Sequence, residues 1–150
     1  MYQRIVASKV RETFAKISEG DWEAMVSSTA PEFTYRFYGD HALGGERRTR
    51  DALRRWWRRV FSMLSEPRFT VDQVVSQGPP WNTRVAAAVR VEARLPDGTA
   101  YRNVIHQFMT LKWGRLVEVR TLEDTAALER ALERLAELGH AEATAAPIED

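Results

Sequence analysis

The segment from Tyr101 to Thr125, YRNVIHQFMTLKWGRLVEVRTLEDT, constrains the fold more than any other part of the chain. Two runs rich in strand-forming side chains flank Lys112-Trp113-Gly114, which predicts a hairpin that reverses at this turn. Asp124 and Thr125 then precede an alanine- and leucine-rich run, and an oxygen-bearing side chain at that place is typical of a helix N-cap. The segment therefore predicts a hairpin followed at once by a helix.

Hydrophobic periodicity predicts three helices earlier in the chain. Residues 2–18 carry apolar side chains at helical spacing, and Gly20 suits the C-terminal end of that helix. A short helix follows before Pro31, and residues 53–64 repeat apolar side chains as an amphipathic helix does. The apolar stripe of this third helix consists of Leu53, Trp56, Trp57, Val60, Phe61 and Leu64.

Strand-like runs fill the remaining positions. Residues 33–38 are aromatic and extended, and residues 69–76 and 83–95 form two runs on either side of Gly78-Pro79-Pro80. The order is therefore helix, helix, strand, helix, then four strands in a meander and a final helix. Helices gathered before an antiparallel sheet indicate an α+β fold. A strongly bent sheet wrapped against the early helices would leave a cavity between the two layers.

Length and composition limit the classes of function. We expect one domain over residues 1–139 and a disordered or frayed tail over residues 140–150. The absence of cysteine excludes disulfides and thiolate chemistry, and no apolar run is long enough to cross a membrane. The N-terminus lacks the apolar centre of a signal peptide, so we expect cytoplasmic residence. A formal net charge of +1 gives no global attraction to nucleic acid or membrane, so a polyanion partner would need a local patch.

Several short motifs, in their order and spacing, resemble the SnoaL-like branch of the nuclear transport factor 2-like superfamily. They are Glu19-Gly20-Asp21-Trp22, Arg50-Asp51-Ala52-Leu53, Pro80-Trp81-Asn82-Thr83, and the run from Gly114 to Arg120 with Asp124-Thr125. The resemblance covers residues 2–138. It implies a cone-shaped α+β fold in which a curved mixed or antiparallel sheet packs against N-terminal helices, with a C-terminal helix. It implies no single reaction, because the superfamily includes isomerases, polyketide cyclases, epoxide hydrolases, dehydratases and non-enzymes.

The ketosteroid isomerases belong to this superfamily, and their resemblance to the chain places His106 where they keep a neutral aspartic acid as an oxyanion donor. Asp40 falls near their general-base aspartate. Phe14 falls at their oxyanion-binding tyrosine, and phenylalanine cannot donate a hydrogen bond. The resemblance therefore argues against steroid isomerase activity.

Limonene-type epoxide hydrolases and SnoaL-type cyclases carry an acidic residue late in the last strand, where the resemblance places Thr121. The hydrolases also pair an arginine with an aspartate on the long strand, where this chain has Ala88 and Arg90. If the chain is aligned with the hydrolases in this way, the Arg90 side chain faces the cavity. Alternation with the apolar Val89 and Val91 instead predicts that Arg90 faces solvent. The known catalytic groups are thus exchanged, and a pocket with different polar groups remains.

His106 and Asp40 are the candidate catalytic residues. A histidine titrates near neutral pH, so His106 could move a proton or donate a hydrogen bond to a ligand oxygen. A partly buried histidine bonded to a neighbour would explain it equally well. Asp40, beside Gly39, could be a carboxylate at the pocket mouth, although ordinary turn chemistry also explains an aspartate there.

Seven arginines, offset by Glu46 and Asp51, give residues 46–59 a net charge of +5. Arginines near Trp56 and Trp57 could bind nucleic acid by phosphate contacts and stacking. The tryptophans lie on the apolar stripe, however, and most of the arginines lie off it. This separation favours a core-packed helix with a solvated basic back, so no nucleic-acid partner is predicted.

The sequence predicts a SnoaL-like protein that binds a small apolar or aromatic molecule in the cone pocket. We expect no cofactor, no membrane partner and no metal, because no histidine pair or carboxylate cluster has metal-ligand spacing. If the chain is an enzyme, we expect cofactor-free acid–base chemistry of the isomerase, cyclase, dehydratase or hydrolase type. The alternative is a non-catalytic module that forms a homodimer through the sheet face. Besides His106 and Asp40, the expected pocket residues are Phe14, Trp22, Tyr35, Phe37, Trp57, Arg90, Phe108 and Thr121.

Overall fold

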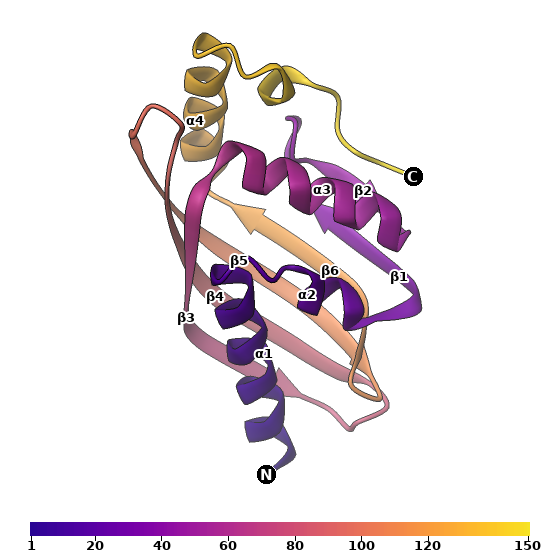
Figure 1. The fold of residues 1–150 in the computed structure, drawn as a ribbon. Helices are drawn as coiled ribbons and strands as arrows, with labels where there is room; N and C mark the ends of the chain where they lie inside the picture. Colours follow the sequence, from indigo (N-terminus) through magenta and orange to yellow (C-terminus); the bar gives the residue numbers. More distant parts are fainter.

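The computed structural model describes residues 1–150 and shows the predicted α+β architecture (Figure 1). Four α-helices, one 3-10 helix and six strands follow one another along the chain. Their bounds are α1 Tyr2–Ser18, α2 Glu23–Ser27, β1 Thr29–Phe37, β2 Gly45–Arg47, α3 Arg50–Met63, β3 Ser65–Gln77, β4 Thr83–Arg94, β5 Ala100–Lys112, β6 Arg115–Glu123, α4 Thr125–Glu137 and η1 Ala141–Thr144.

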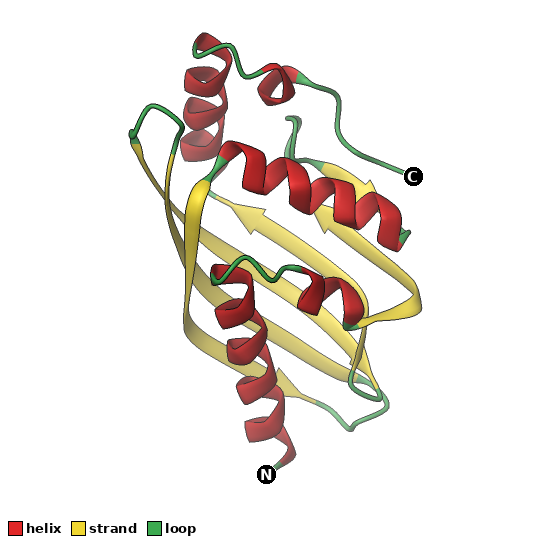
Figure 2. Ribbon diagram, in the orientation of Figure 1, coloured by secondary structure: helices red, strands yellow, loops and turns green.

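All six strands form one mixed sheet in the order β2-β1-β6-β5-β4-β3. The strands β3 to β6 form the predicted antiparallel meander, whereas β1 runs parallel to β6. The sheet is strongly curved, and α1, α2 and α3 cover its concave face (Figure 2). Shifts of register interrupt the β3–β4 and β5–β6 ladders, and such irregularities bend a sheet locally. The curved sheet and its helical cover confirm the predicted cone.

Alternation along the strands decides which side chains enter the core. In β5, Ile105, Gln107 and Met109 are buried under the helices, while the intervening residues face outward, because successive strand residues point to opposite faces. The buried apolar side chains of sheet and helices form one continuous cluster. One core is what a single domain of this length requires.

The helix α3 packs its apolar stripe into this core and keeps its arginines on the other side. Thr49 caps the helix by accepting a hydrogen bond from the Ala52 N–H, and the Trp56 Nε1–H donates to the Leu43 carbonyl at 2.9 Å. Arg54 forms a forked ion pair with Glu23 of α2. The arginines near α3 thus contact neighbouring segments of the same chain.

Arg47, at the end of β2, is fully buried without a carboxylate partner. Its Nε donates to the Ile148 carbonyl at 2.9 Å and its Nη2 to the Gly44 carbonyl at 2.6 Å. The guanidinium also lies over the rings of Tyr35 and Trp56, with 5.8 and 5.3 Å from Cζ to the ring centroids. Burial lowers the pKa of Arg47 to about 10.

The C-terminal residues 140–150 are ordered against α3 and β2, so the predicted frayed tail is wrong. Ala143 is buried, and Arg59 donates to the Ala146 carbonyl at 2.8 Å. The Asp150 carboxylate accepts from the backbone N–H groups of Arg48 and Thr49, just before α3 begins. The tail has little apolar surface to bury, but its carbonyls satisfy buried arginine donors, which hydrophobic patterning does not reveal.

Deleting residues 146–150 should lower the free energy of unfolding by about 2 kcal/mol, because Arg47 Nε would be left buried without its acceptor. Urea denaturation of the truncated and full chains measures the difference. Glu149→Ala is the control, because the Glu149 carboxylate makes no hydrogen bond within the chain and its loss should have a small effect. Equal stability of the truncated and full chains would show that the tail is frayed after all.

Candidate functional site

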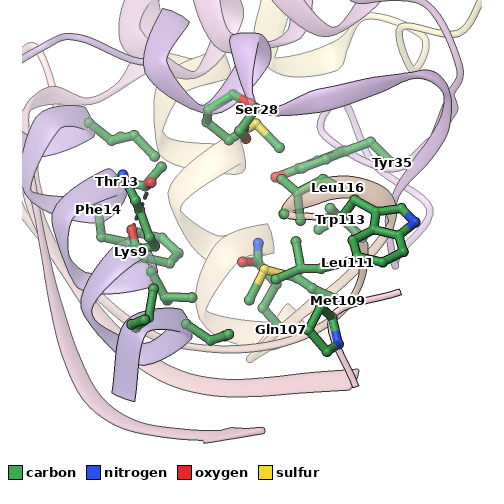
Figure 3. Close-up of a pocket in the computed structure, with 18 of the residues that line it drawn as sticks. Lys9, Thr13, Phe14, Ser28, Tyr35, Gln107, Met109, Leu111, Trp113 and Leu116 are labelled. Atoms are coloured by element: carbon green, nitrogen blue, oxygen red, sulfur yellow. Dashed lines mark hydrogen bonds between the residues drawn. The ribbon is translucent and has the colours of Figure 1, made fainter. Parts of the chain in front are cut away.

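A cavity of about 380 Å³ lies between α1 and the concave face of the sheet. Figure 3 shows its wall, with α1 on one side and the side chains of β5 and β6 across from it. Fourteen of its twenty lining residues are hydrophobic, which suits an apolar ligand. The wall includes Val6, Val10, Phe14, Ile17, Met25, Tyr35, Trp57, Gln107, Met109, Leu111, Leu116 and Val119.

A smaller hollow of about 40 Å³ lies next to the cavity. Phe14, Tyr35, Trp57 and Gln107 line both spaces, so the two are neighbours on either side of these side chains. Further polar side chains lie around the hollow: the Gln107 amide donates to the Thr121 hydroxyl at 3.0 Å. An apolar cavity that ends in polar groups can orient a ligand as well as bind it.

Glu123, the last residue of β6, supplies a carboxyl to the hollow. The residue as a whole is half-buried, and its carboxyl makes no hydrogen bond or ion pair within the chain. Burial raises the pKa of Glu123 to about 8, since nothing nearby compensates the charged form. A raised pKa favours the protonated carboxyl near neutral pH, and in that form the group can donate a hydrogen bond or a proton.

Two other hydrogen-bond donors, the Tyr35 hydroxyl and the Trp57 indole N–H, belong to residues that line both the cavity and the hollow. Burial raises the pKa of Tyr35 to about 12, against the opposing effects of a hydrogen bond with Thr121 and of the Arg47 charge, so its phenol stays protonated. Trp57 Nε1 is buried and has no hydrogen-bond partner. An unpaired buried N–H costs free energy, and a ligand oxygen could remove that cost.

Five of the predicted pocket residues lie in these walls. Phe14, Tyr35 and Trp57 line both the cavity and the hollow, while Phe37 and Thr121 line the hollow alone. The alternation along the strands and the apolar stripes of the helices place these side chains on the inner face.

His106, Phe108 and Arg90 lie on the outer face of the sheet, so their predicted places in the pocket are wrong. His106 and Phe108 are exposed on β5. Arg90 is exposed on β4 and forms a two-point ion pair with Asp72, at 2.8 Å for each bond. The alternation along β4 had already pointed Arg90 to solvent, and the same rule places His106 outside because its neighbour Gln107 faces inward.

Asp40 and Trp22 also lie away from the cavity. Asp40 borders a shallow groove formed with α4 and the C-terminal segment, and His106 does not line that groove. Trp22 is half-buried beside α2, where the Arg58 guanidinium lies 5.9 Å from its ring centroid. It lines neither the cavity nor the hollow.

Sequence reasoning missed Gln107 and Glu123, although a signal for both was present. Thr121 and Glu123 are two residues apart on β6 and therefore share a face. The resemblance places Thr121 where relatives carry an acidic residue. In the structure, Glu123, two residues further along β6, brings a carboxyl group to the hollow.

A curved sheet covered by helices, with an apolar cavity between the two layers, defines the class of cone-shaped α+β proteins, and comparison with known sequences gives the family. The chain belongs to the SnoaL-like domain family, whose sequence profile matches residues 10–119. No curated protein sequence matches the chain. No helix combines the length and the apolar character that crossing a membrane requires.

Solved structures of low sequence identity share the fold. PrhC from Penicillium brasilianum is 13% identical, with 95% of each chain covered and a TM-score of 0.81. TerC, co-crystallised with polyporic acid, is 20% identical over 85% of this chain and 97% of its own, with a TM-score of 0.71. IdmH from Streptomyces antibioticus, a proposed polyketide cyclase, is 18% identical over the same shares, with a TM-score of 0.68. At these identities the likeness extends to the fold alone.

Replacing Glu123 with glutamine should change how stability depends on pH. The folded-state pKa lies above the ordinary value, so the native protein binds the proton more tightly and its stability falls as pH rises from about 4.5 through 8. Glu123→Gln removes this loss, so its melting temperature relative to the natural chain should increase from pH 5 to pH 9. Glu118→Gln, on the outer face of the same strand, is the matched control. Parallel stability curves for Glu123→Gln and the natural chain would mean that the Glu123 pKa is ordinary.

Proposed function

We propose that this chain binds a small aromatic or apolar molecule that carries a carbonyl or hydroxyl group, and that Glu123 performs cofactor-free acid–base chemistry on it. The observation that carries the proposal is an apolar cavity beside a hollow whose lining includes Glu123, a carboxyl group without a partner in the chain and with a pKa raised by burial. Proton transfer is thereby assigned to Glu123 rather than to His106, which lies on the outer face.

The size and lining of the cavity support a ligand of one to a few rings. Ligand sites in proteins commonly enclose about 300–1,000 Å³, and the cavity lies at the small end of that range. Phe14 and Trp57 offer aromatic faces, and Met25 and Met109 can adapt to an irregular outline. The hollow, whose mainly hydrophobic lining includes Gln107, Thr121 and Glu123, would then receive the oxygen-bearing end of the ligand.

The chemistry follows from the groups around the hollow. A protonated Glu123 can give its proton to a carbonyl oxygen, and the resulting carboxylate can remove a proton from a neighbouring carbon, which is the pattern of an isomerisation, cyclisation or dehydration. Tyr35 and Trp57 can stabilise charge on the oxygen by hydrogen bonding. The polyporic acid in TerC and the cyclase activity proposed for IdmH are compatible with this class of chemistry.

The pair Gln107→Leu and His106→Ala tests the binding site, because the two residues are neighbours in β5 but face opposite sides of the sheet. A panel of aromatic ketones and phenols, with naphthalene as a ligand without oxygen, can be titrated by tryptophan fluorescence. Gln107→Leu should weaken binding of the oxygen-bearing ligands about tenfold, the equivalent of one hydrogen bond, and leave naphthalene unaffected. His106→Ala should bind every ligand as the natural chain does.

The contrary results are equally specific. Loss of affinity in His106→Ala, with none in Gln107→Leu, would move the site to the outer face. If no ligand of the panel binds, the proposal that the cavity is a site for aromatic molecules is wrong.

A second function, homodimerisation, is favoured by the outer face of the sheet. Val104, Phe108 and Leu122 are 50%, 54% and 51% exposed there, on the neighbouring strands β5 and β6. Small alanines of β4 lie beside them, since Ala86 pairs with Phe108. An exposed apolar area of this kind commonly marks a protein–protein contact.

If this face forms the dimer, Phe108→Asp should shift the chain to monomer, because it places a charge in the centre of the contact. Analytical ultracentrifugation of the two proteins at equal concentration measures the change. Val75→Asp, on the peripheral strand β3, is a milder control for added charge. A natural chain that is monomeric at high concentration would contradict the dimer.

A further inference from the structure

Three segments meet at the end of the molecule where the cavity opens. They are the start of α1, the β3–β4 loop of residues 78–82, and the β5–β6 turn at residues 113–114, and Figure 1 shows them at the opposite end from α4. Trp113 N–H donates to the Pro80 carbonyl at 2.8 Å, and the hydroxyls of Tyr2 and Thr83 lie 2.7 Å apart. These bonds hold the three segments together as one surface, which we call the open end.

Large apolar side chains project from the open end into solvent. Trp81 and Trp113 are 58% and 72% exposed, and their ring centroids lie 6.0 Å apart. Ile5 is 54% exposed on the facing side of α1. Ile5 and Trp113 also line the cavity, and Figure 3 shows Trp113 at its edge. The exposed apolar groups therefore surround the entrance rather than lie scattered over the surface.

The charged side chains of the open end are mostly basic, although Glu118 borders the groove that Trp81, Arg84 and Lys112 line. Residues 1–11, 77–84 and 111–116 contain no aspartate or glutamate, although the whole chain has 21 acidic against 22 basic residues. Of their six basic residues, Lys9 alone forms an ion pair, with Glu12 at 3.9 Å. Glu118, the first acid beyond the β5–β6 turn, is paired with Arg120 instead. The basic residues of the open end are Arg4, Lys9, Arg11, Arg84, Lys112 and Arg115.

We propose that the open end docks on a membrane surface that contains anionic phospholipids. Tryptophans favour the boundary between hydrocarbon and headgroups, because the indole has an apolar body and a polar N–H. Lysine and arginine near the surface are attracted by anionic headgroups. Trp81 and Trp113 enter the headgroup region, and the surrounding cations contact the phosphates.

A membrane fits this surface better than a folded protein partner does. The tryptophans stand on a turn and a loop at the tip of the molecule, and a flat lipid surface needs no shaped complement to receive them. Docking in this way also places the cavity entrance against the bilayer. An apolar ligand then moves between lipid and cavity without crossing water, a consequence that rests on the proposed function, whereas the docking itself does not.

Co-sedimentation of the full chain with lipid vesicles tests the proposal without any cavity ligand, so its failure would leave the proposed function standing. We expect binding to phosphatidylcholine vesicles that contain about one third phosphatidylglycerol, and at least about tenfold weaker binding to phosphatidylcholine alone or in high salt. The double variant Trp81→Ala/Trp113→Ala should bind anionic vesicles about tenfold more weakly. Tyr38→Ala, which removes a partly exposed aromatic just beyond the end of β1, should bind as the natural chain does.

Several results would overturn the proposal. One is no binding to anionic vesicles at low salt, and another is an equal loss in the tryptophan variant and in Tyr38→Ala. Binding to a duplex oligonucleotide but not to vesicles, unchanged by the tryptophan substitutions, would identify the open end as a nucleic-acid surface instead. Trp113→Gln provides a milder second variant, with folding checked by circular dichroism, and undiminished vesicle binding by this variant would also contradict the proposal.

Discussion

The alternation of side chains along β5 and β6 is the constraint on which the rest of the structure depends. Each residue of these strands faces either the helices or the outer surface, so a single step in sequence separates Gln107 in the cavity from His106 outside it. The curvature of the sheet turns the inner face into a wall around a space that the helices do not fill completely. The same rule gives the outer face its apolar patch and the inner face its carboxyl group.

The sequence predicted the architecture well because the architecture depends on periodic patterns. The apolar stripe of α3, the hairpin at Lys112-Trp113-Gly114 and the cap at Asp124 are local signals, and all three are present in the structure. The candidate site was predicted less well, because its chemistry depends on single residues and their exact register. The resemblance drew attention to Thr121, whereas the carboxyl in the wall of the hollow is that of Glu123, two residues further along β6.

Other features depend on contacts between residues distant in the chain, which no local pattern describes. Arg47 can be buried because the Ile148 carbonyl, 101 positions away in sequence, accepts its hydrogen bond and aromatic rings cover it. The tail therefore appeared featureless in sequence, although its carbonyls accept hydrogen bonds from Arg47 and Arg59. The basic open end shows the same limit, since its three segments are far apart in sequence and adjacent only in the fold.

The central claim is that Glu123 is a neutral acid at the inner end of an apolar cavity. The most direct test is an NMR titration of the glutamate side-chain carboxyl carbons, with the Glu123 signal assigned by its loss in Glu123→Gln. The structure predicts a pKa of about 8 for this group, because burial disfavours the carboxylate and no partner compensates it. A pKa near the ordinary value of 4.5 would show that the carboxyl is solvated, and would contradict its assignment as the acid of the site.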